Sequence, residues 1–225
     1  MSVAENFESI KSSIPAYVTL VAVSKTHPPE VIMEAYNAGQ RIFGENKVQE
    51  MISKQEVMPK DIQWHLVGHL QTNKVKYIAP FVSLVHSVDS AKLLKELNKG
   101  GAKNNRIIDC LLQVHIAEED TKFGLSAQEL DTILSNPAVA EYTNVRIVGL
   151  MGMATFTDNM EQVRREFKGL ADIYKNIKQK YFADQPSFNT LSMGMSGDFE
   201  VAIDEGSTMI RVGSSIFGTR NYGEN

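Results

Sequence analysis

Short apolar segments alternate with longer amphipathic segments along the whole chain. The segment 18–24 (VTLVAVS) is continuous, short and rich in valine, which is typical of a buried strand. Comparable segments occupy residues 41–43, 63–67, 83–86, 107–115, 146–151, 188–191 and 209–212. The pattern therefore predicts eight buried strands.

Helical spacing of apolar residues fills most of the intervals between these strands. The predicted helices cover residues 30–38, 45–57, 71–78, 90–100, 159–180 and 198–205, with a leading helix over 2–12. Pro28 and Pro29 favour the start of the second of these helices along the chain, and Gly100-Gly101 is expected to end the helix over 90–100. Ser126 is predicted to cap a further helix, with Glu129 completing a capping box.

Strands that alternate with helices pair in parallel through crossover helices. Eight such units predict a closed (β/α)8 barrel, a TIM barrel of the α/β class. An open doubly wound sheet shares the same local pattern and is the alternative. No linker or low-complexity tract interrupts the chain, so residues 1–225 are expected to form a single barrel domain.

Composition narrows the class of protein. The chain of 225 residues is 43% hydrophobic and 22% charged, with a net charge of −4, which gives no electrostatic reason to expect a nucleic-acid partner. Cys110 is the one cysteine, so no intramolecular disulfide is possible, as is usual in a reducing compartment. The sequence has neither a signal-peptide pattern in residues 1–13 nor a long uncharged apolar run. A cytoplasmic protein without a membrane partner is therefore expected.

Polar residues gather where the predicted strands end, and in a (β/α)8 barrel the functional residues lie at these carboxyl ends. The residues at these positions are Lys25, Asn46, His69, Gln71, Ser87, Met153, Thr155, Ser192 to Ser196, Arg211 and Gly213-Ser214-Ser215.

Lys25 directly follows the first apolar segment, so its amine is expected near the mouth of the barrel. Desolvation there would lower the pKa of the ammonium group, and a lysine with a lowered pKa is a competent nucleophile toward an aldehyde. The alternative is a lysine that extends from the strand end into solvent.

Two loops rich in glycine and serine follow the last two strands, SMGMSGD after the seventh and RVGSS in and after the eighth. Small residues let a phosphate approach backbone N–H groups, and barrels often bind phosphate with these two loops. The sequence therefore predicts phosphate binding, although ordinary tight turns have a similar composition.

Other chemistry has weaker support. His65 and His69 are four residues apart, but no third ligand is apparent and no metal site is predicted. His86 and His115 fall in apolar segments and are interpreted as hydrogen-bonded core residues, whereas Met153, Met193 and Met195 are expected at the barrel mouth. The chain has no GxSxG, Walker or GxGxxG motif.

Several stretches resemble one family over nearly the whole chain. VAVSKTHPPE, RIFGENKVQE, WHLVGHLQTNK, VHSVD, VGLMGMA and LSMGMSGDFEVAIDEGSTMIRVGSSIFGTR closely resemble the pyridoxal 5′-phosphate (PLP) homeostasis family, also called YggS/PROSC. This family is similar to the barrel domain of alanine racemase, a fold-type III PLP protein. The resemblance implies a barrel of that type without the C-terminal β domain.

The resemblance also implies roles for individual residues. Lys25 would hold PLP as a Schiff base, the internal aldimine, and Asn46 would lie near the ring. Ser192 and Met193 would help to hold the phosphate end. Gly213 and Ser214 would give backbone N–H groups to the phosphate, with Ser215 adjacent. Arg211 would face the pyridine nitrogen.

A cation beside the pyridine nitrogen disfavours its protonation, and an unprotonated ring is a poorer electron sink. The resemblance therefore implies storage, delivery or buffering of PLP, with apo PLP-dependent enzymes as recipients, no catalytic residues and a monomeric state. A PLP-dependent amino-acid racemase is the first alternative, for which Tyr222 or His69 would be the second base. A barrel enzyme that forms a Schiff base without PLP, and an interaction protein without ligand, are the others.

Overall fold

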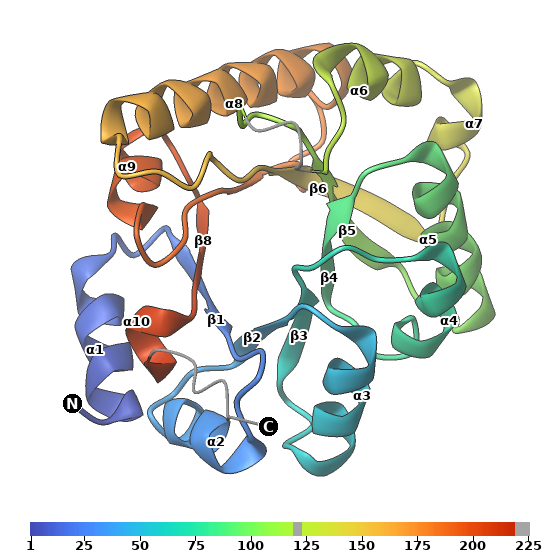
Figure 1. Ribbon diagram of the computed structural model, residues 1–225. Coiled ribbons are helices and arrows are strands. Elements are labelled where there is room, and N and C mark those ends of the chain that lie inside the picture. Colours follow the sequence, from blue (N-terminus) through green and yellow to red (C-terminus); the bar gives the residue numbers. More distant parts are fainter. Residues whose placement is uncertain (119–122, 219–225) are drawn as a thin grey trace.

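Eight parallel strands close into a barrel in the computed structural model, which describes residues 1–118 and 123–218 (Figure 1). The strands follow one another around the barrel in sequence order, and β8 pairs with β1. Their bounds are β1 Thr19–Val23, β2 Ile42–Glu45, β3 Gln63–Leu66, β4 Leu84–Val88, β5 Ile108–Gln113, β6 Val145–Met151, β7 Thr190–Ser192 and β8 Met209–Val212. The (β/α)8 barrel is confirmed, and the open sheet is excluded.

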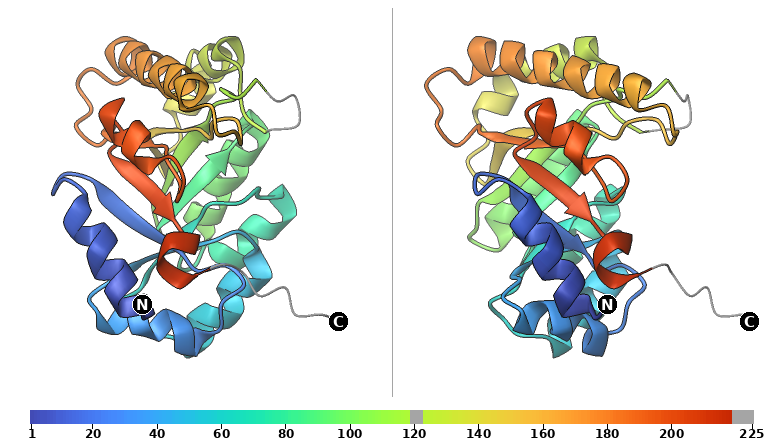
Figure 2. Two further views of the ribbon diagram at one scale, coloured as in Figure 1. Left: turned by 60° about the vertical axis from the view of Figure 1, so that its left-hand side comes forward. Right: turned by 90° about the vertical axis from the view of Figure 1, so that its left-hand side faces the viewer.

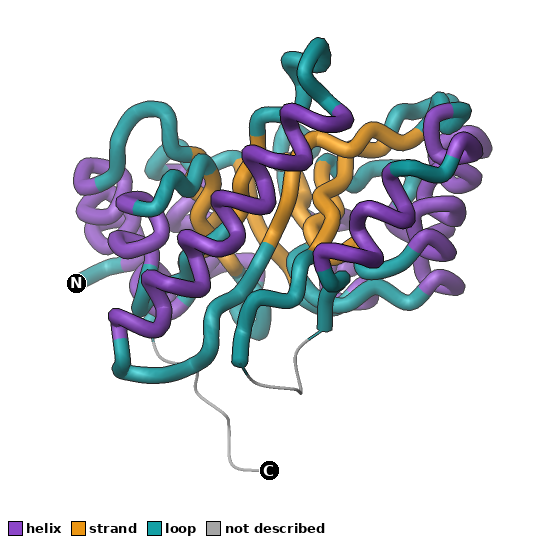
Figure 3. The backbone as a smooth tube through the Cα atoms, turned by 90° about the horizontal axis from the view of Figure 1, so that it is seen from above, coloured by secondary structure: helices purple, strands orange, loops and turns teal. Residues whose placement is uncertain are grey.

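Helices surround the strands on the outside (Figure 3). Their bounds are α1 Val3–Ser13, α2 Pro29–Asn37, α3 Val48–Val57, the 3-10 turn Thr72–Lys74 with α4 Val75–Ile78, α5 Ala91–Lys103, α6 Ala127–Leu134, α7 Pro137–Ala140, α8 Met160–Tyr181, α9 Phe199–Asp204 and α10 Ser214–Phe217. Ser126 and Glu129 form the predicted capping box at the start of α6. Among the helices described, none combines the length and apolar character that crossing a membrane requires.

Three local expectations were wrong. The helix predicted over 90–100 continues to Lys103, so Gly100-Gly101 does not end it; Gly101 serves close packing instead, since a Cβ there would collide with the carbonyl oxygen of Asn144. β5 ends at Gln113, so His115 lies beyond the strand and is half-buried instead of being in the core. Glu45, expected to begin a helix, is instead the last residue of β2 and is fully buried.

Apolar side chains form two layers. The larger layer fills the space between the strands and the helices, and includes Trp64, Phe43 and Phe167. The smaller consists of Val21, Leu84, Leu111, Val148, Met151 and Met209. α1 packs against α10 (Figure 2). At this contact the side-chain amide of Asn6 donates to the carbonyl oxygen of Ile216 at 3.0 Å. This contact joins the first and the last of the described helices beside the ends of β1 and β8.

Candidate functional site

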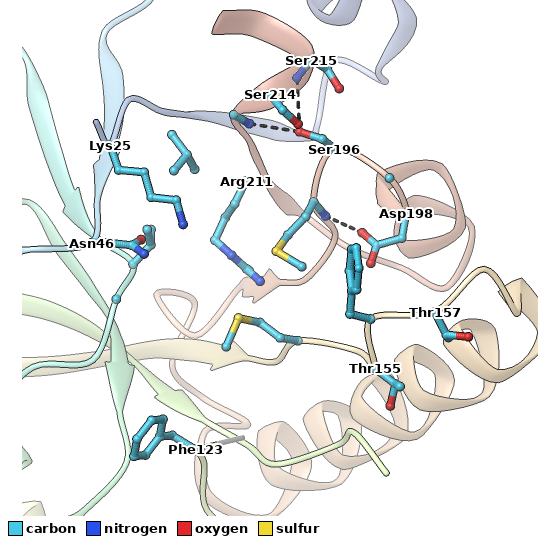
Figure 4. A pocket seen from close by; sticks show the side chains of 18 of the residues that line it. Lys25, Asn46, Phe123, Thr155, Thr157, Ser196, Asp198, Arg211, Ser214 and Ser215 are labelled. Atoms are coloured by element: carbon cyan, nitrogen blue, oxygen red, sulfur yellow. Dashed lines mark hydrogen bonds between the residues drawn. The ribbon is translucent and has the colours of Figure 1, made fainter. Parts of the chain in front are cut away.

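A pocket of about 760 Å³ opens at the carboxyl ends of the strands. Loops that follow β1, β2, β3, β5, β6, β7 and β8 line it, as expected for a functional site in a parallel barrel. The pocket brings together these predicted site residues: Lys25, Asn46, Arg211, Gly213 and Ser214. Figure 4 shows the side chains of Lys25, Asn46 and Arg211 directed into it.

Strand pairing explains why Lys25 and Arg211 share one pocket although they are far apart in the sequence. β1 lies beside β8 with Val21 opposite Arg211, and Lys25 follows the end of β1 at Val23. Lys25 is half-buried, and Arg211 is only 4% exposed. The closure of the barrel therefore places a primary amine and a guanidinium group at one end of adjacent strands.

The residue after Lys25 has a strained backbone. Thr26 adopts a φ of 69°, in the left-handed region that a β-branched residue rarely occupies. Such a conformation costs about 1–3 kcal/mol and persists where the surroundings impose it. The backbone turns sharply directly after Lys25. This turn follows the end of β1 and leaves the lysine side chain at the pocket.

The position of Asn46 depends on close packing between the loop after β2 and the loop after β3. A Cβ on Gly68 would lie 2.8 Å from the Cα of Asn46, so only glycine allows the loop after β3 to pack here. Ser87, which lies within β4 and not after it as expected, donates to the carbonyl oxygen of Gly68 at 2.6 Å. The contact fixes the loop that carries Asn46 against the pocket wall.

Arg211 begins a hydrogen-bonded chain of buried side chains. One guanidinium nitrogen donates to the Oγ of Ser192 at 2.6 Å, and another donates to the carbonyl oxygen of Gly152 at 3.0 Å. The Nδ1 of His86 lies 3.1 Å from Ser192 Oγ, and its Nε2 lies 3.0 Å from the Nδ1 of His65.

The charge of Arg211 determines which group donates and which accepts each hydrogen bond along this chain. Arg211 can only donate, so Ser192 accepts from it and its own hydroxyl hydrogen is available to His86 Nδ1. His86 then donates from Nε2 to His65. Burial lowers the pKa of His65 to about 3, and burial together with the nearby His65 and Arg211 lowers the pKa of His86 well below its ordinary value. Burial also lowers the pKa of Arg211 to about 10, which leaves it cationic near neutral pH, whereas both histidines are neutral.

Backbone N–H groups converge on one oxygen of the pocket lining, in the loops after β7 and β8. The amides of Gly213 and Ser215 both donate to the Oγ of Ser196, at 3.2 and 3.4 Å (Figure 4). A Cβ on Gly213 would lie 3.1 Å from the carbonyl oxygen of Val23, so a side chain there would crowd β1. These two loops thus form a concave set of donors that an anionic oxygen fits.

Two predicted residues lie elsewhere. Ser192 is the last residue of β7 and is fully buried beneath Arg211, and Met193 is fully buried in the larger apolar layer. Neither lines the pocket, so the expected position of Met193 at the barrel mouth is wrong, whereas the role of Ser192 and Met193 at the phosphate end stays a prediction. The strand ends one residue later than predicted, at Ser192, and the residues of the following loop that line the pocket are Met195, Ser196, Gly197 and Asp198.

Sequence reasoning missed most of the residues that line the pocket wall away from Lys25. It includes Gln113, Phe123, Thr157, Asp158 and Met160, together with the expected Met153 and Thr155. Phe123 stacks on His69, with ring centroids 4.7 Å apart. Thr155 could be predicted from its position in the loop after a strand. Phe123 lies ten residues beyond the end of β5, so no signal in the sequence pointed to it.

Glu166 on α8 holds this wall in place. Its carboxylate accepts from the backbone N–H of Thr155 at 2.6 Å, from the Thr155 hydroxyl at 2.7 Å and from the backbone N–H of Glu118 at 3.3 Å. Desolvation raises the pKa of Glu166, but the hydrogen bonds from Thr155 and its neighbours outweigh it and lower the pKa overall. The ionised carboxylate therefore ties the loops after β5 and β6 together.

Replacing Glu166 by glutamine is expected to lower the free energy of unfolding by about 1–3 kcal/mol, because an amide oxygen is a weaker acceptor than a carboxylate for these N–H groups. Urea unfolding at pH 7.5 measures the change. Glu161→Gln, at an exposed position of the same helix, is the control. Equal stability of the two variants would contradict the assignment.

Comparisons with known proteins agree with this geometry. The chain matches the alanine racemase N-terminal domain family over residues 1–221. It is 43% identical to the pyridoxal phosphate homeostasis protein of Aquifex aeolicus, over 90% of this chain and 87% of that protein. The solved structure of PipY from Synechococcus elongatus with PLP bound is 37% identical, with a TM-score of 0.87 over 96% of this chain and 100% of that one.

Alanine racemase shares the fold at a greater distance. The enzyme from Bartonella henselae is 17% identical, with a TM-score of 0.72, and the match covers 97% of this chain and 60% of that one. At this identity the likeness concerns the barrel alone. Taken with the closer relatives, these comparisons show that the chain belongs to the pyridoxal phosphate homeostasis protein family, within the wider family of alanine racemase N-terminal domains.

Proposed function

We propose that this protein binds PLP at Lys25 and serves in PLP homeostasis, by storing, delivering or buffering the cofactor. One observation carries the proposal: a single pocket contains the amine-bearing side chain of Lys25, the guanidinium of Arg211 and the converging N–H groups of Gly213 and Ser215. PLP supplies an aldehyde that condenses with a primary amine, and it also carries a phosphate dianion and a pyridine nitrogen.

The residues fit the phosphate end of PLP. Ser196 Oγ occupies the point where two backbone N–H groups converge, and a phosphate oxygen can accept the same two hydrogen bonds. Gly213 packs against Val23 of β1, where a Cβ would lie 3.1 Å from the carbonyl oxygen, so its lack of a side chain lets this loop approach the end of β1. Ser214 and Ser215 are exposed beside it at the start of α10. The proposed phosphate contacts therefore come from Gly213, Ser214, Ser215 and Ser196.

The fixed cation of Arg211 favours binding over catalysis on a carbanion. Ser192 and Gly152 hold its guanidinium by two of its nitrogens, and it remains charged near neutral pH. Facing the pyridine nitrogen, it would disfavour protonation there, because like charges repel. Asn46 would contact the ring from the side of β2. These residues bind and orient the cofactor, and none of them is proposed to be catalytic.

The relatives support the same role. The Aquifex aeolicus protein is named a pyridoxal phosphate homeostasis protein, and PipY was solved with PLP bound. We propose further that the protein is a cytoplasmic monomer whose recipients are apo PLP-dependent enzymes. Mixing the PLP-loaded protein with an apo enzyme and following recovered activity against free PLP at equal concentration would test the transfer.

An amino-acid racemase is the second candidate, since the fold is shared with alanine racemase. It would need a second acid or base in the pocket. His69 is exposed at the rim, with its Nδ1 3.2 Å from a carboxylate oxygen of Asp89, and Tyr222 lies outside the described residues. Incubation with L-alanine or L-serine in D2O, followed by NMR of the α-proton, separates the two functions, because a carrier leaves that proton unexchanged.

The decisive experiment is spectroscopic. Protein incubated with PLP and freed of excess ligand is expected to absorb in the visible range, and borohydride should remove that band and attach the cofactor irreversibly. Peptide mapping should then find the modification on Lys25. A colourless protein, or a modification spread over surface lysines, would reject the proposed function.

A further inference from the structure

A cluster of polar and charged side chains, all buried except the partly exposed Glu50, lies beside the backbone of Lys25. The cluster, here called the Glu45 cluster, consists of Ser24, Glu45, Glu50 and Lys54. Glu45 ends β2, and Glu50 and Lys54 lie on α3. Lys54 is 4% exposed and Glu45 is fully buried, so both charges are removed from water.

Lys54 uses its full hydrogen-bonding capacity inside the cluster. Its ammonium donates to Glu45 Oε1 at 2.7 Å, to Glu50 Oε1 at 2.8 Å and to the backbone carbonyl oxygen of Ser24 at 2.8 Å. An ammonium has three hydrogens, and these three acceptors account for all of them. The geometry is therefore specific to a cation with several donors.

The cluster forms hydrogen bonds to the residues on both sides of Lys25. Before it, the carbonyl oxygen of Ser24 accepts from Lys54, and the Ser24 hydroxyl donates to Glu45 Oε1 at 2.6 Å. After it, the N–H of Thr26 donates to Glu50 Oε1 at 2.5 Å. This second bond holds the left-handed conformation of Thr26, with φ at 69°.

Stability alone does not account for these charges. A buried ion pair is often no more stabilising than apolar side chains of the same volume. In addition, Glu45 Oε2 is buried without a hydrogen-bond partner among the described residues. Burial raises the pKa of Glu45, which is a further sign that the site is costly for a carboxylate. What the cluster provides that apolar packing could not is a set of bonds to Ser24 and Thr26.

We propose that Lys54, with Glu45 and Glu50, is a positioning residue for Lys25: the cluster fixes the backbone on either side of that lysine and thereby aims its amine into the pocket. The inference rests on the proposed function, because it assigns the cluster to the formation of the covalent link between Lys25 and PLP. Lys54 itself does not line the pocket.

The first test uses the mildest change. In Glu50→Gln the side chain keeps its shape, but it loses the charge that attracts Lys54 and the N–H of Thr26. The rate of visible-band formation with PLP is expected to fall about 3- to 10-fold, as when one charge-assisted hydrogen bond is weakened. Glu56→Gln makes the same charge change at an exposed position of α3 and should react as the wild type does.

The second test removes the cluster. Lys54→Met combined with Glu45→Gln removes both buried charges and leaves Glu50, which is partly exposed, in contact with solvent. The rate is expected to fall about 10- to 100-fold because the amine is misplaced. Leu97→Ala creates a cavity at a buried position of α5, remote from the pocket, and is the control for lost stability alone. Thermal midpoints show how far each variant is destabilised, and Leu97→Ala should keep the wild-type rate.

The outcomes separate the two ideas. If the wild type forms no borohydride-reducible link at Lys25, the proposed function fails. If the wild type forms it and Glu50→Gln reacts at the rate of Glu56→Gln, the positioning role is overturned. A loss of rate in Leu97→Ala equal to that of the double variant would also overturn it, because stability would then explain the effect.

Discussion

Replacing Lys25 by alanine is expected to abolish the visible absorbance of the PLP-loaded protein and its borohydride-reducible modification. The amine at the end of β1 is the group proposed to react, and the pocket around it would remain. Affinity should fall as well, because the phosphate and ring contacts alone would hold the ligand. A ligand at 100 times its Kd stabilises a protein by about 2.7 kcal/mol, so a thermal shift measured at a fixed PLP concentration should shrink strongly.

Surface lysines also react with aldehydes, so the control is another lysine. Lys76 is exposed on α4 and does not line the pocket, and Lys76→Ala should match the wild type in absorbance and thermal shift. A Lys25→Ala protein that retained a single reducible PLP at another lysine would refute the assignment of Lys25.

Acidification from pH 6.5 to 5 is expected to destabilise the protein through His65 and His86. Their pKa values in the folded state lie below the value of about 6.5 for an unfolded chain, because both rings are buried as neutral groups. Their contribution is present above pH 6.5 and is lost as pH falls toward the folded pKa, which is about 3 for His65. At pH 6.5 an unfolded-state histidine is only half protonated, so the loss between pH 6.5 and 5 is about 1.6 kcal/mol for each histidine, or about 3 kcal/mol for the pair.

Urea unfolding at several pH values measures this loss. The double variant His65→Gln with His86→Gln is expected to be less stable at pH 7.5, because the chain that ends at Arg211 is broken, but its stability should vary less between pH 6.5 and 5. Parallel pH profiles for the wild type and the variant would show that other groups cause the loss.

The barrel could be predicted because its signal is local. Short apolar segments separated by amphipathic ones are visible within a few residues, and β8 has the predicted bounds 209–212. Lys25 was placed correctly for the same reason, since it follows a buried strand directly. Arg211 was placed correctly because it lies on a strand whose neighbours are apolar.

The rest of the site depends on contacts between distant segments. Ser192 was expected in a loop because the predicted strand ended one residue early, and in the structure it supports Arg211 from below. Glu45 was assigned to a helix, although it ends β2 and meets Lys54 across the gap between strand and helix. No periodicity in the sequence encodes such a pairing, because it arises only when the two elements pack.

The pairing of the first strand with the last has a consequence for how the protein is made. Lys25 leaves the ribosome early in synthesis, but Arg211 and the Gly213 loop that complete its pocket emerge among the last residues described. Chains grow at about 5–20 residues per second, so the lysine spends roughly ten seconds or more outside the tunnel without its partners. If Lys25 binds PLP as proposed, loading is expected only after β8 has been synthesised, and a nascent chain halted before β8 is expected to show only the reactivity of an ordinary lysine.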